Sequence, residues 1–214
     1  MGSVLLTGFE AFGDETVNPS ERAALALDGC EAVPGCRVRS VILPVTWDRG
    51  PARILNELDA LPDAAAVVMV GQAGGHAGIA VERVAVNVSN GRDETGRTRK
   101  EEPVVPGGPP AYFSTLPLEE IVRALAEDGL PAFISNSAGT YLCNCVFYAV
   151  MHRLAAAAGR PDGPAKAPPA GFVHVPFLPE QAVGKRPLPP SMSLPDIERA
   201  LRVVIRTTLA AART

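Results

Sequence analysis

The residues best suited to chemistry lie between positions 135 and 145, where the sequence reads SNSAGTYLCNC. The short apolar segment 131–134 precedes them and predicts a buried strand. Segment 146–157 follows, lacks Gly and Pro, and is long enough for a helix. The Ser/Asn/Gly cluster favours a tight turn, with Thr140 as a candidate N-cap. Cys143 is therefore expected in the first turn of a helix that follows the carboxyl end of a strand.

This position favours the thiolate form of Cys143. Unpaired backbone N–H groups and the positive end of the helix dipole both stabilise a negative charge there. A nucleophile at a strand–turn–helix junction is a recurring arrangement in hydrolases. The alternative is a small buried hydrophobic residue on a core-facing helix, which is the usual environment of a cysteine. Cys143 is thus a candidate nucleophile whose role depends on the rest of the chain.

His174 and Glu82 are the candidate partners of this thiol. An imidazole exchanges protons near neutral pH, and a carboxylate can hold its ring and tautomer. In the expected strand 171–178 the side chain of His174 points away from those of its two valine neighbours. In the expected strand 79–88 Glu82 lies on an otherwise apolar face. The alternatives are a core histidine bonded to backbone, and a glutamate that pairs with an arginine or reaches solvent.

Other histidines and cysteines offer competing readings. His76 and His152 are rival bases, but His152 lies nine positions after Cys143, which is about 13 Å along a helix. Cys145 diverges from Cys143 by roughly 200° on a helix, so the two thiols cannot form a disulfide there. Three histidines and no Cys-x-x-Cys pair argue against zinc. A redox dithiol or a metal site is therefore disfavoured.

Strands and helices are expected to alternate along the chain. Segment 64–70 is a continuous apolar run, typical of a strand buried on both faces of a parallel sheet. Further strands are expected at 3–6, 37–43, 79–88, 131–134 and 171–178, and helices at 19–28, 47–61, 116–129, after Cys143 and after Ser193. This order predicts an open α/β fold with a mostly parallel sheet and helices on both faces.

Local signals define several boundaries. Asn18, Pro19 and Glu21 together predict an N-cap, a proline at the first helical position and a capping box. Segment 89–110 has no periodicity and many charges, Gly and Pro, so it is expected to be a long surface loop, mobile or functional, that could close over a substrate. Segment 159–170 reads as a flexible Pro/Gly/Ala linker.

Composition narrows the function classes. The chain has 214 residues, 47% hydrophobic and 20% charged, with a net charge of −3 and a pI of about 5.7. We therefore expect a single domain over 1–214, without a basic face for nucleic acid. No apolar run approaches the length of a membrane span, and a cytoplasmic location is expected.

Two further motifs have alternative interpretations. The glycine-rich segment 71–78 could cradle a phosphate, but it lacks the Lys-Ser/Thr of a P-loop and the G-x-G-x-x-G spacing. Phe9 and Phe12, in the loop after the first strand, are either core residues or the walls of a flat apolar pocket.

Several motifs occur together in a fixed order. They are TGFEAFG at 7–13 with NPS at 18–20, ERVAVN at 82–87, PAYFSTLP at 110–117, SNSAG at 135–139 with YLCN at 141–144, and FVHVP at 172–176 with PEQ at 179–181. In these the chain resembles the pyrrolidone-carboxyl peptidase (pyroglutamyl peptidase I) family of cysteine peptidases. The resemblance implies hydrolysis of the amide bond after an N-terminal pyroglutamate of peptides, with Cys143 as nucleophile, His174 as base and Glu82 as its orienting partner.

The resemblance also implies a three-layer α/β/α sandwich with a mixed, mostly parallel sheet. It implies a homodimer or homotetramer that needs neither metal nor cofactor. Phe9, Phe12 and Tyr141 match positions that hold the lactam ring, and Gln72 and Arg92 match further positions of the family's site. Family members usually carry Arg in place of His76, an aliphatic residue in place of Asp93 and an aromatic one in place of Cys145.

Two other function classes compete with a peptidase. A homologue without activity that binds a small ligand or a partner would be inert to iodoacetamide and cleave no amide. A nucleotide-binding module would use segment 71–78 and bind ATP or NAD. The filled positions of Cys143, His174 and Glu82 favour the peptidase.

Overall fold

A seven-stranded sheet forms the centre of the molecule in a computed structural model that describes residues 2–158 and 167–213. Its spatial order is β10-β5-β11-β4-β1-β3-β2. The strands, in chain order, are β1 (Gly2–Phe9), β2 (Glu31–Val33), β3 (Cys36–Leu43), β4 (Ala64–Gln72), β5 (Ile79–Glu82), β10 (Ala132–Ser135) and β11 (Ala170–Val175). Strands β11, β4, β1 and β3 run parallel, and β5 and β10 run together in the opposite direction. The expected mixed, mostly parallel sheet is confirmed.

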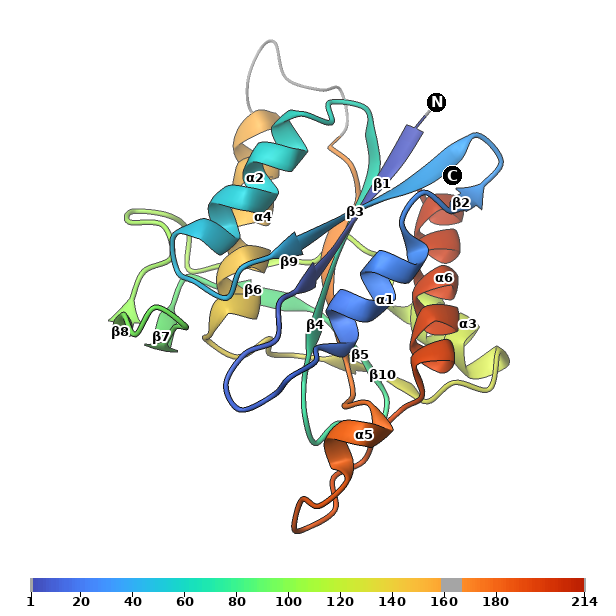
Figure 1. Cartoon of the computed structure of the whole chain (residues 1–214). Coiled ribbons are helices and arrows are strands. Elements are labelled where there is room, and N and C mark those ends of the chain that lie inside the picture. The colour runs from blue at the N-terminus through green and yellow to red at the C-terminus, as the bar shows by residue number, and fades with distance from the viewer. Residues whose placement is uncertain (1, 159–166, 214) are drawn as a thin grey trace.

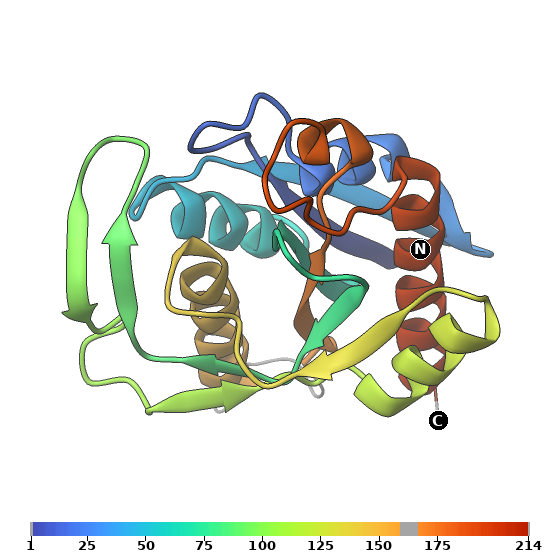
Figure 2. The ribbon, with the colours of Figure 1, turned by 90° about the horizontal axis from the view of Figure 1, so that it is seen from below.

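Helices cover both faces of this sheet, as Figures 1 and 2 show. One face packs against α1 (Pro19–Leu27), α3 (Leu118–Glu127) and α6 (Leu194–Ala211). The other packs against α2 (Arg49–Asp59) and α4 (Leu142–Ala158). The short α5 (Pro179–Ala182) lies beyond the end of β11. The three-layer α/β/α arrangement is confirmed.

Alternation along the strands produces two separate cores. Successive side chains of a strand point to opposite faces. Val4 and Leu6 accordingly join the core under α1, α3 and α6, whereas Leu5 and Phe9 join the core under α2 and α4. Residues Ala66 to Val70 of β4 are inaccessible to solvent. The uninterrupted apolar run of this strand therefore reflects burial on both faces.

The expected strand 79–88 is wrong in its extent, because the chain changes sheets at Arg83. β5 ends at Glu82, and β6 (Val84–Val86) pairs with β9 (Ala111–Phe113) in a separate two-stranded sheet. Between them the N–H of Arg83 donates to Ser135, while its carbonyl accepts from Ser114. Period-two alternation continues through the junction, so the pattern alone does not reveal it.

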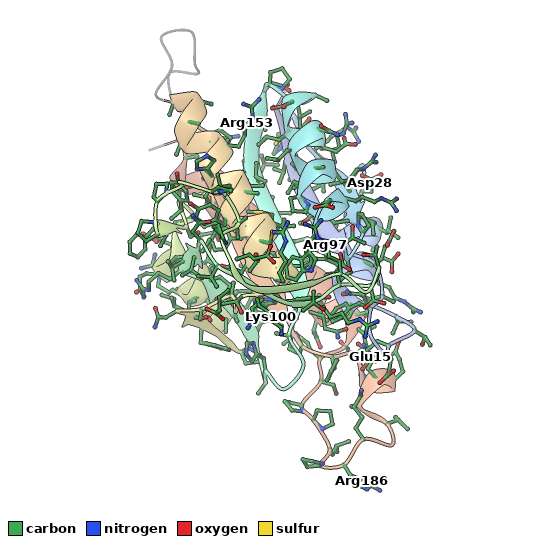
Figure 3. The ribbon with its side chains drawn as sticks, turned by 90° about the vertical axis from the view of Figure 1, so that its left-hand side faces the viewer. Glu15, Asp28, Arg97, Lys100, Arg153 and Arg186 are labelled. Atoms are coloured by element: carbon green, nitrogen blue, oxygen red, sulfur yellow. The ribbon has the colours of Figure 1, made fainter. Side chains whose placement is uncertain are left out.

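The long loop expected at 89–110 is also wrong, since much of it is a β-hairpin. β7 (Ser89–Arg92) pairs with β8 (Thr98–Glu102). In Figure 3 the hairpin crosses the front of the molecule, where Arg97 and Lys100 are labelled. Its strands have mostly polar, solvent-facing residues and therefore lack an apolar alternation. Ion pairs of Arg97 and Arg99 with Asp48, together with the buried turn residue Asp93 described below, hold it instead.

Helix ends follow the predicted chemistry with two corrections. Asn18 caps α1, but its side chain accepts from the N–H of Ser20, and no reciprocal capping box with Glu21 occurs among the described contacts. α4 begins at Leu142, so the N-cap position falls on Tyr141 and not on Thr140. Ser193 caps α6 as expected, by accepting from the N–H of Asp196.

The predicted linker 159–170 lies largely outside the described residues, which resume at 167. Ala170 is already the first residue of β11. In the described part of the chain, no helix combines the length and apolar character needed to cross a membrane.

Candidate active site

His174 and Glu82 are joined by a buried hydrogen bond. β5 and β11 are antiparallel, with Ala80 opposite His174, so that Glu82 is a diagonal neighbour of His174 on the same face. The Nδ1 atom of His174 lies 2.7 Å from Oε1 of Glu82, and both side chains are buried. A carboxylate accepts only, so Nδ1 donates and Nε2 is left for another partner.

Cys143, the second residue of α4, lies beside this imidazole. Attraction and hydrogen bonding between its thiol and His174 raise the pKa of the imidazole. The predicted position of Cys143, in the first turn of the helix that follows β10, is confirmed. Glu82, Cys143 and His174 thus meet on the α4 side of the sheet, although they belong to three different elements.

Gly71 explains how α4 approaches the sheet closely enough. A Cβ atom on Gly71 would lie 2.9 Å from Sγ of Cys143 and 2.8 Å from the ring of Phe172. Both distances are below van der Waals contact, so only glycine leaves room for the thiol at this point of β4. The first glycine of segment 71–78 therefore has a packing role beside Cys143, in place of the phosphate-binding role considered above.

Asn144 fixes the start of α4 against the neighbouring strand. Its side chain is fully buried, accepts from the N–H of Val86 and donates to the carbonyls of Val86 and Val88. These contacts satisfy the backbone of a segment that belongs to no large sheet. They also hold the residue next to Cys143 in place, so they restrict where the thiol can lie.

The hairpin β7–β8 adds two further attachments to the same turn. The N–H of Asn90 donates to the carbonyl of Thr140 over 2.8 Å, and the hydroxyl of Tyr141 donates to the carbonyl of Arg92 over 2.8 Å. At Gly91, where φ is +126°, a Cβ atom would lie 2.8 Å from the Tyr141 ring. The turn before α4 is thereby held from outside by the hairpin.

Electrostatics favour a charged His174. Burial lowers the pKa of the imidazole, but attraction and hydrogen bonding to Cys143, followed by the bond and the attraction to Glu82, outweigh this and raise the pKa to about 9. A raised pKa means that the imidazolium is the dominant form at neutral pH. The site is thus suited to a thiolate–imidazolium pair, with a buried carboxylate behind it.

The other thiols and His152 have different environments. Cys145 lies in the core under α4, where burial raises its pKa to about 11 and keeps it a neutral thiol. All four cysteines are free, as expected for unpaired thiols. Nδ1 of His152 pairs with the hydroxyl of Tyr112 at 2.9 Å, away from Cys143. The rival interpretations based on these residues gain no geometric support.

Aromatic side chains surround the turn before Cys143. The rings of Phe12 and Tyr141 have centroids 6.5 Å apart, and Trp47 packs edge-on against Tyr141 at 5.2 Å. Phe9 is buried and contacts Phe172 at 6.4 Å, so it lies deeper than Phe12. Of the three aromatic residues predicted to hold a ligand, Phe12 and Tyr141 are partly exposed, and their neighbouring rings are tilted by 48°.

Gln72 and Arg92 are placed less directly. Gln72 follows Gly71 on β4, and its Oε1 accepts from the amide of Gln181, which also contacts Glu15. Arg92 ends β7, with its side chain beside Gly96 and its carbonyl bonded to Tyr141. Both residues are therefore linked to the site indirectly. Arg92 reaches the turn before Cys143 through Tyr141, and Gln72 is the chain neighbour of Gly71.

Two of the unusual residues, His76 and Asp93, have identifiable surroundings. The ring of His76 lies 6.4 Å from that of His174, at a right angle to it. The buried carboxylate of Asp93 accepts from the N–H groups of Trp47, Thr95 and Arg97. Burial raises the pKa of Asp93, but the bonds with Thr95, Trp47 and Arg97 outweigh this and lower it. Asp93 thus forms the hairpin turn and positions Trp47.

The sequence analysis missed the supporting roles of Asn144 and Trp47. A buried Asn beside the candidate nucleophile was a usable signal, since Asn is a poor helix former and must satisfy its amide. Trp47 is the one tryptophan of the chain and stands at the start of the expected helix 47–61. Its bonds to Asp93 and Arg97 span a sequence distance that no local pattern reveals.

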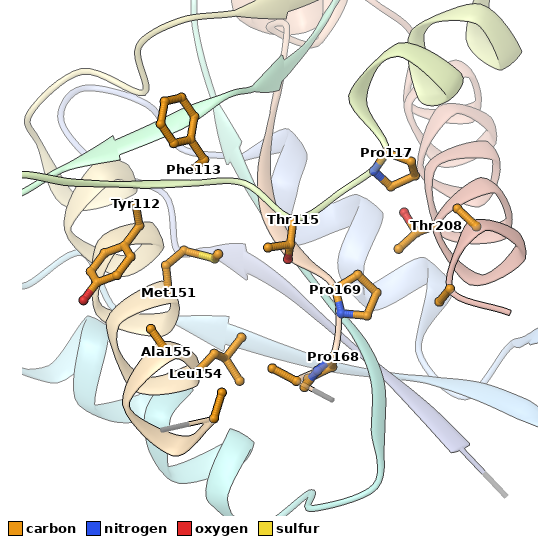
Figure 4. A pocket seen from close by; sticks show the side chains of 14 residues that line it. Tyr112, Phe113, Thr115, Pro117, Met151, Leu154, Ala155, Pro168, Pro169 and Thr208 are labelled. Carbon is orange, nitrogen blue, oxygen red and sulfur yellow. The ribbon is translucent and has the colours of Figure 1, made fainter. Parts of the chain in front are cut away.

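A large hollow lies elsewhere, at the far end of α4. This cavity of about 450 Å³ is lined by Met151, Leu154, Phe113, Pro168, Thr208 and their neighbours, as Figure 4 shows. None of Cys143, His174 and Glu82 lines it. Within residues 2–158 and 167–213, no three His, Cys, Asp or Glu side chains cluster in a way that could hold a metal ion.

A three-layer α/β/α fold with a helix-start thiol beside a carboxylate-held imidazole is an arrangement suited to a cysteine peptidase. Comparison with known proteins identifies the family within that class. The family model of pyroglutamyl peptidase matches residues 2–211. The chain belongs to the pyroglutamyl peptidase family.

Individual relatives agree with this assignment. A pyrrolidone-carboxylate peptidase of Chromobacterium violaceum is 49% identical over 212 residues, covering 98% of this chain and 93% of its own. The structure of a mutant pyrrolidone carboxyl peptidase of Pyrococcus furiosus superposes with a TM-score of 0.90 at 41% identity, covering 98% and 99%. Pyroglutamyl peptidase I of Bacillus amyloliquefaciens gives 0.88 at 35% identity, covering 98% of each chain.

Proposed function

We propose that this chain hydrolyses the amide bond after an N-terminal pyroglutamyl residue of peptides, with Cys143 as nucleophile, His174 as acid and base, and Glu82 as the group that orients His174. Family membership supports the exopeptidase activity. The observation that carries the residue roles is the buried 2.7 Å bond between Glu82 and His174, whose imidazole also bonds the thiol of Cys143. Among the described residues, no other thiol is bonded to an imidazole.

The reaction begins with attack of the Cys143 thiolate on the pyroglutamyl carbonyl carbon. The carbonyl π electrons move to oxygen and give a tetrahedral oxyanion. The helical ladder of α4 begins with the N–H of Cys145, bonded to Tyr141 at 3.0 Å. The N–H groups before it, including that of Cys143, have no partner within the helix and are available to stabilise the oxyanion.

Proton transfer by His174 completes both halves of the reaction. The imidazolium donates its Nε2 proton to the departing amine as the C–N bond breaks, leaving a thioester on Cys143. The neutral imidazole then removes a proton from water, which attacks the thioester and releases pyroglutamate and the thiolate. The bond from Nδ1 to Glu82 keeps the ring in one orientation and stabilises its positive charge during both steps.

Recognition of the lactam ring requires stacking and polar contacts. Pyroglutamate has no free α-amino group, so an acidic anchor would find no ammonium to bind. The ring centroids of Phe12 and Tyr141 are 6.5 Å apart and their planes are tilted by 48°, so the pair offers two neighbouring aromatic surfaces for the lactam ring. The Oε1 atom of Gln72 accepts from Gln181, so its amide N–H groups remain available as donors. The carbonyl of Arg92 accepts from the hydroxyl of Tyr141 and so helps to hold that ring.

A neutral hydrogen-bonding site explains discrimination against proline. Proline has the same ring size but lacks the ring carbonyl, so a donor of the site would lose its partner. An unpaired buried polar group commonly costs about 1–3 kcal/mol, which corresponds to roughly fivefold to 150-fold in rate.

A cytoplasmic setting and a homo-oligomeric assembly are part of the same proposal. Free cysteines and a thiol nucleophile suit a reducing compartment. Val183 and Leu188 are 79% and 69% exposed. They flank Arg186, which is labelled in Figure 3. Exposed apolar side chains favour association of copies as a dimer or tetramer. Light scattering after size exclusion measures the mass directly, and a monomer would contradict this part.

The test of the proposed function uses two chromogenic amides, pyroglutamyl and prolyl, with and without prior iodoacetamide. We expect cleavage of the pyroglutamyl amide alone, abolished by alkylation. Peptide mapping should place the modification on Cys143 before Cys145, because Cys145 is buried and its pKa is raised to about 11. Folded, reduced protein that cleaves neither amide would indicate a binding protein instead.

A further inference from the structure

One row of residues crosses four strands beside the proposed catalytic residues. Phe133 of β10 lies opposite Ala80 of β5, Ala80 lies opposite His174 of β11, and His174 lies opposite Gly71 of β4. Directly paired residues share a face of the sheet. All four positions therefore face α4, in the order Phe133, Ala80, His174, Gly71. β10 is the edge strand of this row, as Figure 2 shows.

His76 lies between the outer part of this row and His174. Its ring centroid is 5.4 Å from that of Phe133 and 6.4 Å from that of His174, at nearly a right angle to both. The small side chain of Ala80 leaves space between the two strands for this imidazole. Its Nδ1 is buried and has no hydrogen-bond partner among the described residues. Nothing in the proposed mechanism uses His76.

Phe133 completes an open aromatic corner. It is 41% exposed, which is unusual for a phenylalanine in the sheet, and its described ring contact is with His76. Burial and the neighbouring His174 both lower the pKa of His76, whereas Glu82 raises it, and the net effect keeps the ring neutral at pH 7. Phe133 and His76 thus offer one uncharged, partly exposed aromatic surface next to the catalytic imidazole.

The position of this corner along the row indicates its role. The Sγ atom of Cys143 stands over Gly71, on one side of His174. The aromatic corner stands on the opposite side. A substrate has its acyl carbon at Sγ and its departing nitrogen at His174, so the residue that follows the scissile bond continues toward His76 and Phe133.

We propose that His76 and Phe133 form the subsite for the first residue of the departing peptide, and that this subsite favours an aromatic side chain there. The proposal rests on the proposed function above and adds a preference on the leaving-group side to it. Edge-to-face contact between aromatic rings is favourable beyond simple burial. A glycine at the same substrate position would leave both protein rings partly exposed and would gain none of this contact.

The experiment compares two dipeptide amides, pyroglutamyl-phenylalanine amide and pyroglutamyl-glycine amide, by chromatographic release of the amino-acid amide. We expect kcat/KM to be about fivefold higher for the phenylalanine substrate, the size of one good aromatic contact. In the variants Phe133→Ala and His76→Gln this ratio should fall toward one. Phe133→Leu should retain part of the ratio, because it keeps an apolar side chain.

Phe113→Ala is the matched control, since Phe113 is an exposed phenylalanine on a short strand of the separate β6–β9 sheet. It should leave the ratio at the wild-type value. A wild-type ratio near one, or an unchanged ratio in Phe133→Ala, overturns the subsite while cleavage of both substrates still supports the proposed function. A change in oligomer mass in Phe133→Ala with an unchanged ratio assigns the ring to a subunit interface. Cleavage of neither substrate overturns both proposals.

Discussion

The two ends of helix α4 differ in almost every property. At its start, Cys143 and Asn144 are held by partners from the sheet and from strand β6. At its other end, Met151 and Leu154 line an apolar cavity of about 450 Å³, with no charged side chain among the lining residues. This cavity is therefore separate from the proposed catalytic residues.

The difference shows what makes a site reactive. The proposed reaction requires charged groups that partners hold in place: Glu82 bonds His174, and the start of α4 favours a negative charge on its substrate or nucleophile. An apolar cavity excludes water but offers no group that can take or give a proton.

Removing the thiol should give the largest effect. Cys143→Ala is expected to lower kcat/KM for a pyroglutamyl amide by at least about 10⁴-fold, because no nucleophile remains. Met151→Ala, on the same helix at the cavity end, should leave kcat/KM within twofold but lower the free energy of unfolding by about 2 kcal/mol. Kinetics and denaturant unfolding measure the two effects. Equal loss of activity in both variants would remove the contrast between the ends of α4.

Changing the orienting carboxylate should have the next largest effect. Glu82→Gln keeps the shape but can accept or donate, so it no longer selects the tautomer of His174. We expect kcat to fall about 10³-fold with little change in KM. Nitrogen NMR shifts of His174 should report the altered tautomer. A variant with normal kcat would show that Glu82 has a structural role only.

The pH profile should report the pair of charges. The pKa of His174 is raised to about 9, so the imidazolium and its stabilising contacts are fully present below pH 6.5 and are lost as the pH rises through about 9. Activity and stability should both decline across that window. In Cys143→Ala the midpoint should move down, since the attraction to the thiolate is absent. NMR titration of the three histidines should show His76 losing its proton below pH 6.5. A neutral His174 at pH 7 would contradict the charged pair.

A smaller effect is expected from the hairpin turn. Asp93→Ala removes the acceptor of the Trp47 N–H, and Trp47 packs on Tyr141. We expect KM to rise about threefold to tenfold while kcat stays within twofold, because the proposed lactam wall loosens but the triad is untouched. Asp93→Asn keeps one acceptor oxygen, so its KM should lie between those of the wild type and Asp93→Ala. An unchanged KM in Asp93→Ala would separate Trp47 from substrate binding.

Much of the fold followed from local patterns. The continuous apolar run of β4 indicated a doubly covered strand, and the Asn18 and Ser193 caps marked helix starts that the structure contains. The division of segment 79–88 between two sheets was not predictable, because Arg83 changes partners without a change in alternation. The hairpin at 89–102 was missed because its stability comes from distant partners such as Trp47.

The sequence by itself determined the types and order of the reactive groups: a cysteine at a helix start, a histidine and a glutamate within apolar strands, and aromatic residues near the first loop. Only the tertiary structure decided that β5 runs opposite to β11, which makes Glu82 a diagonal neighbour of His174. It also decided that Gly71 admits the thiol and that His76 stands between Phe133 and His174. Periodicity reports which face of an element is buried, whereas the relative direction and register of distant strands depend on packing of the whole chain.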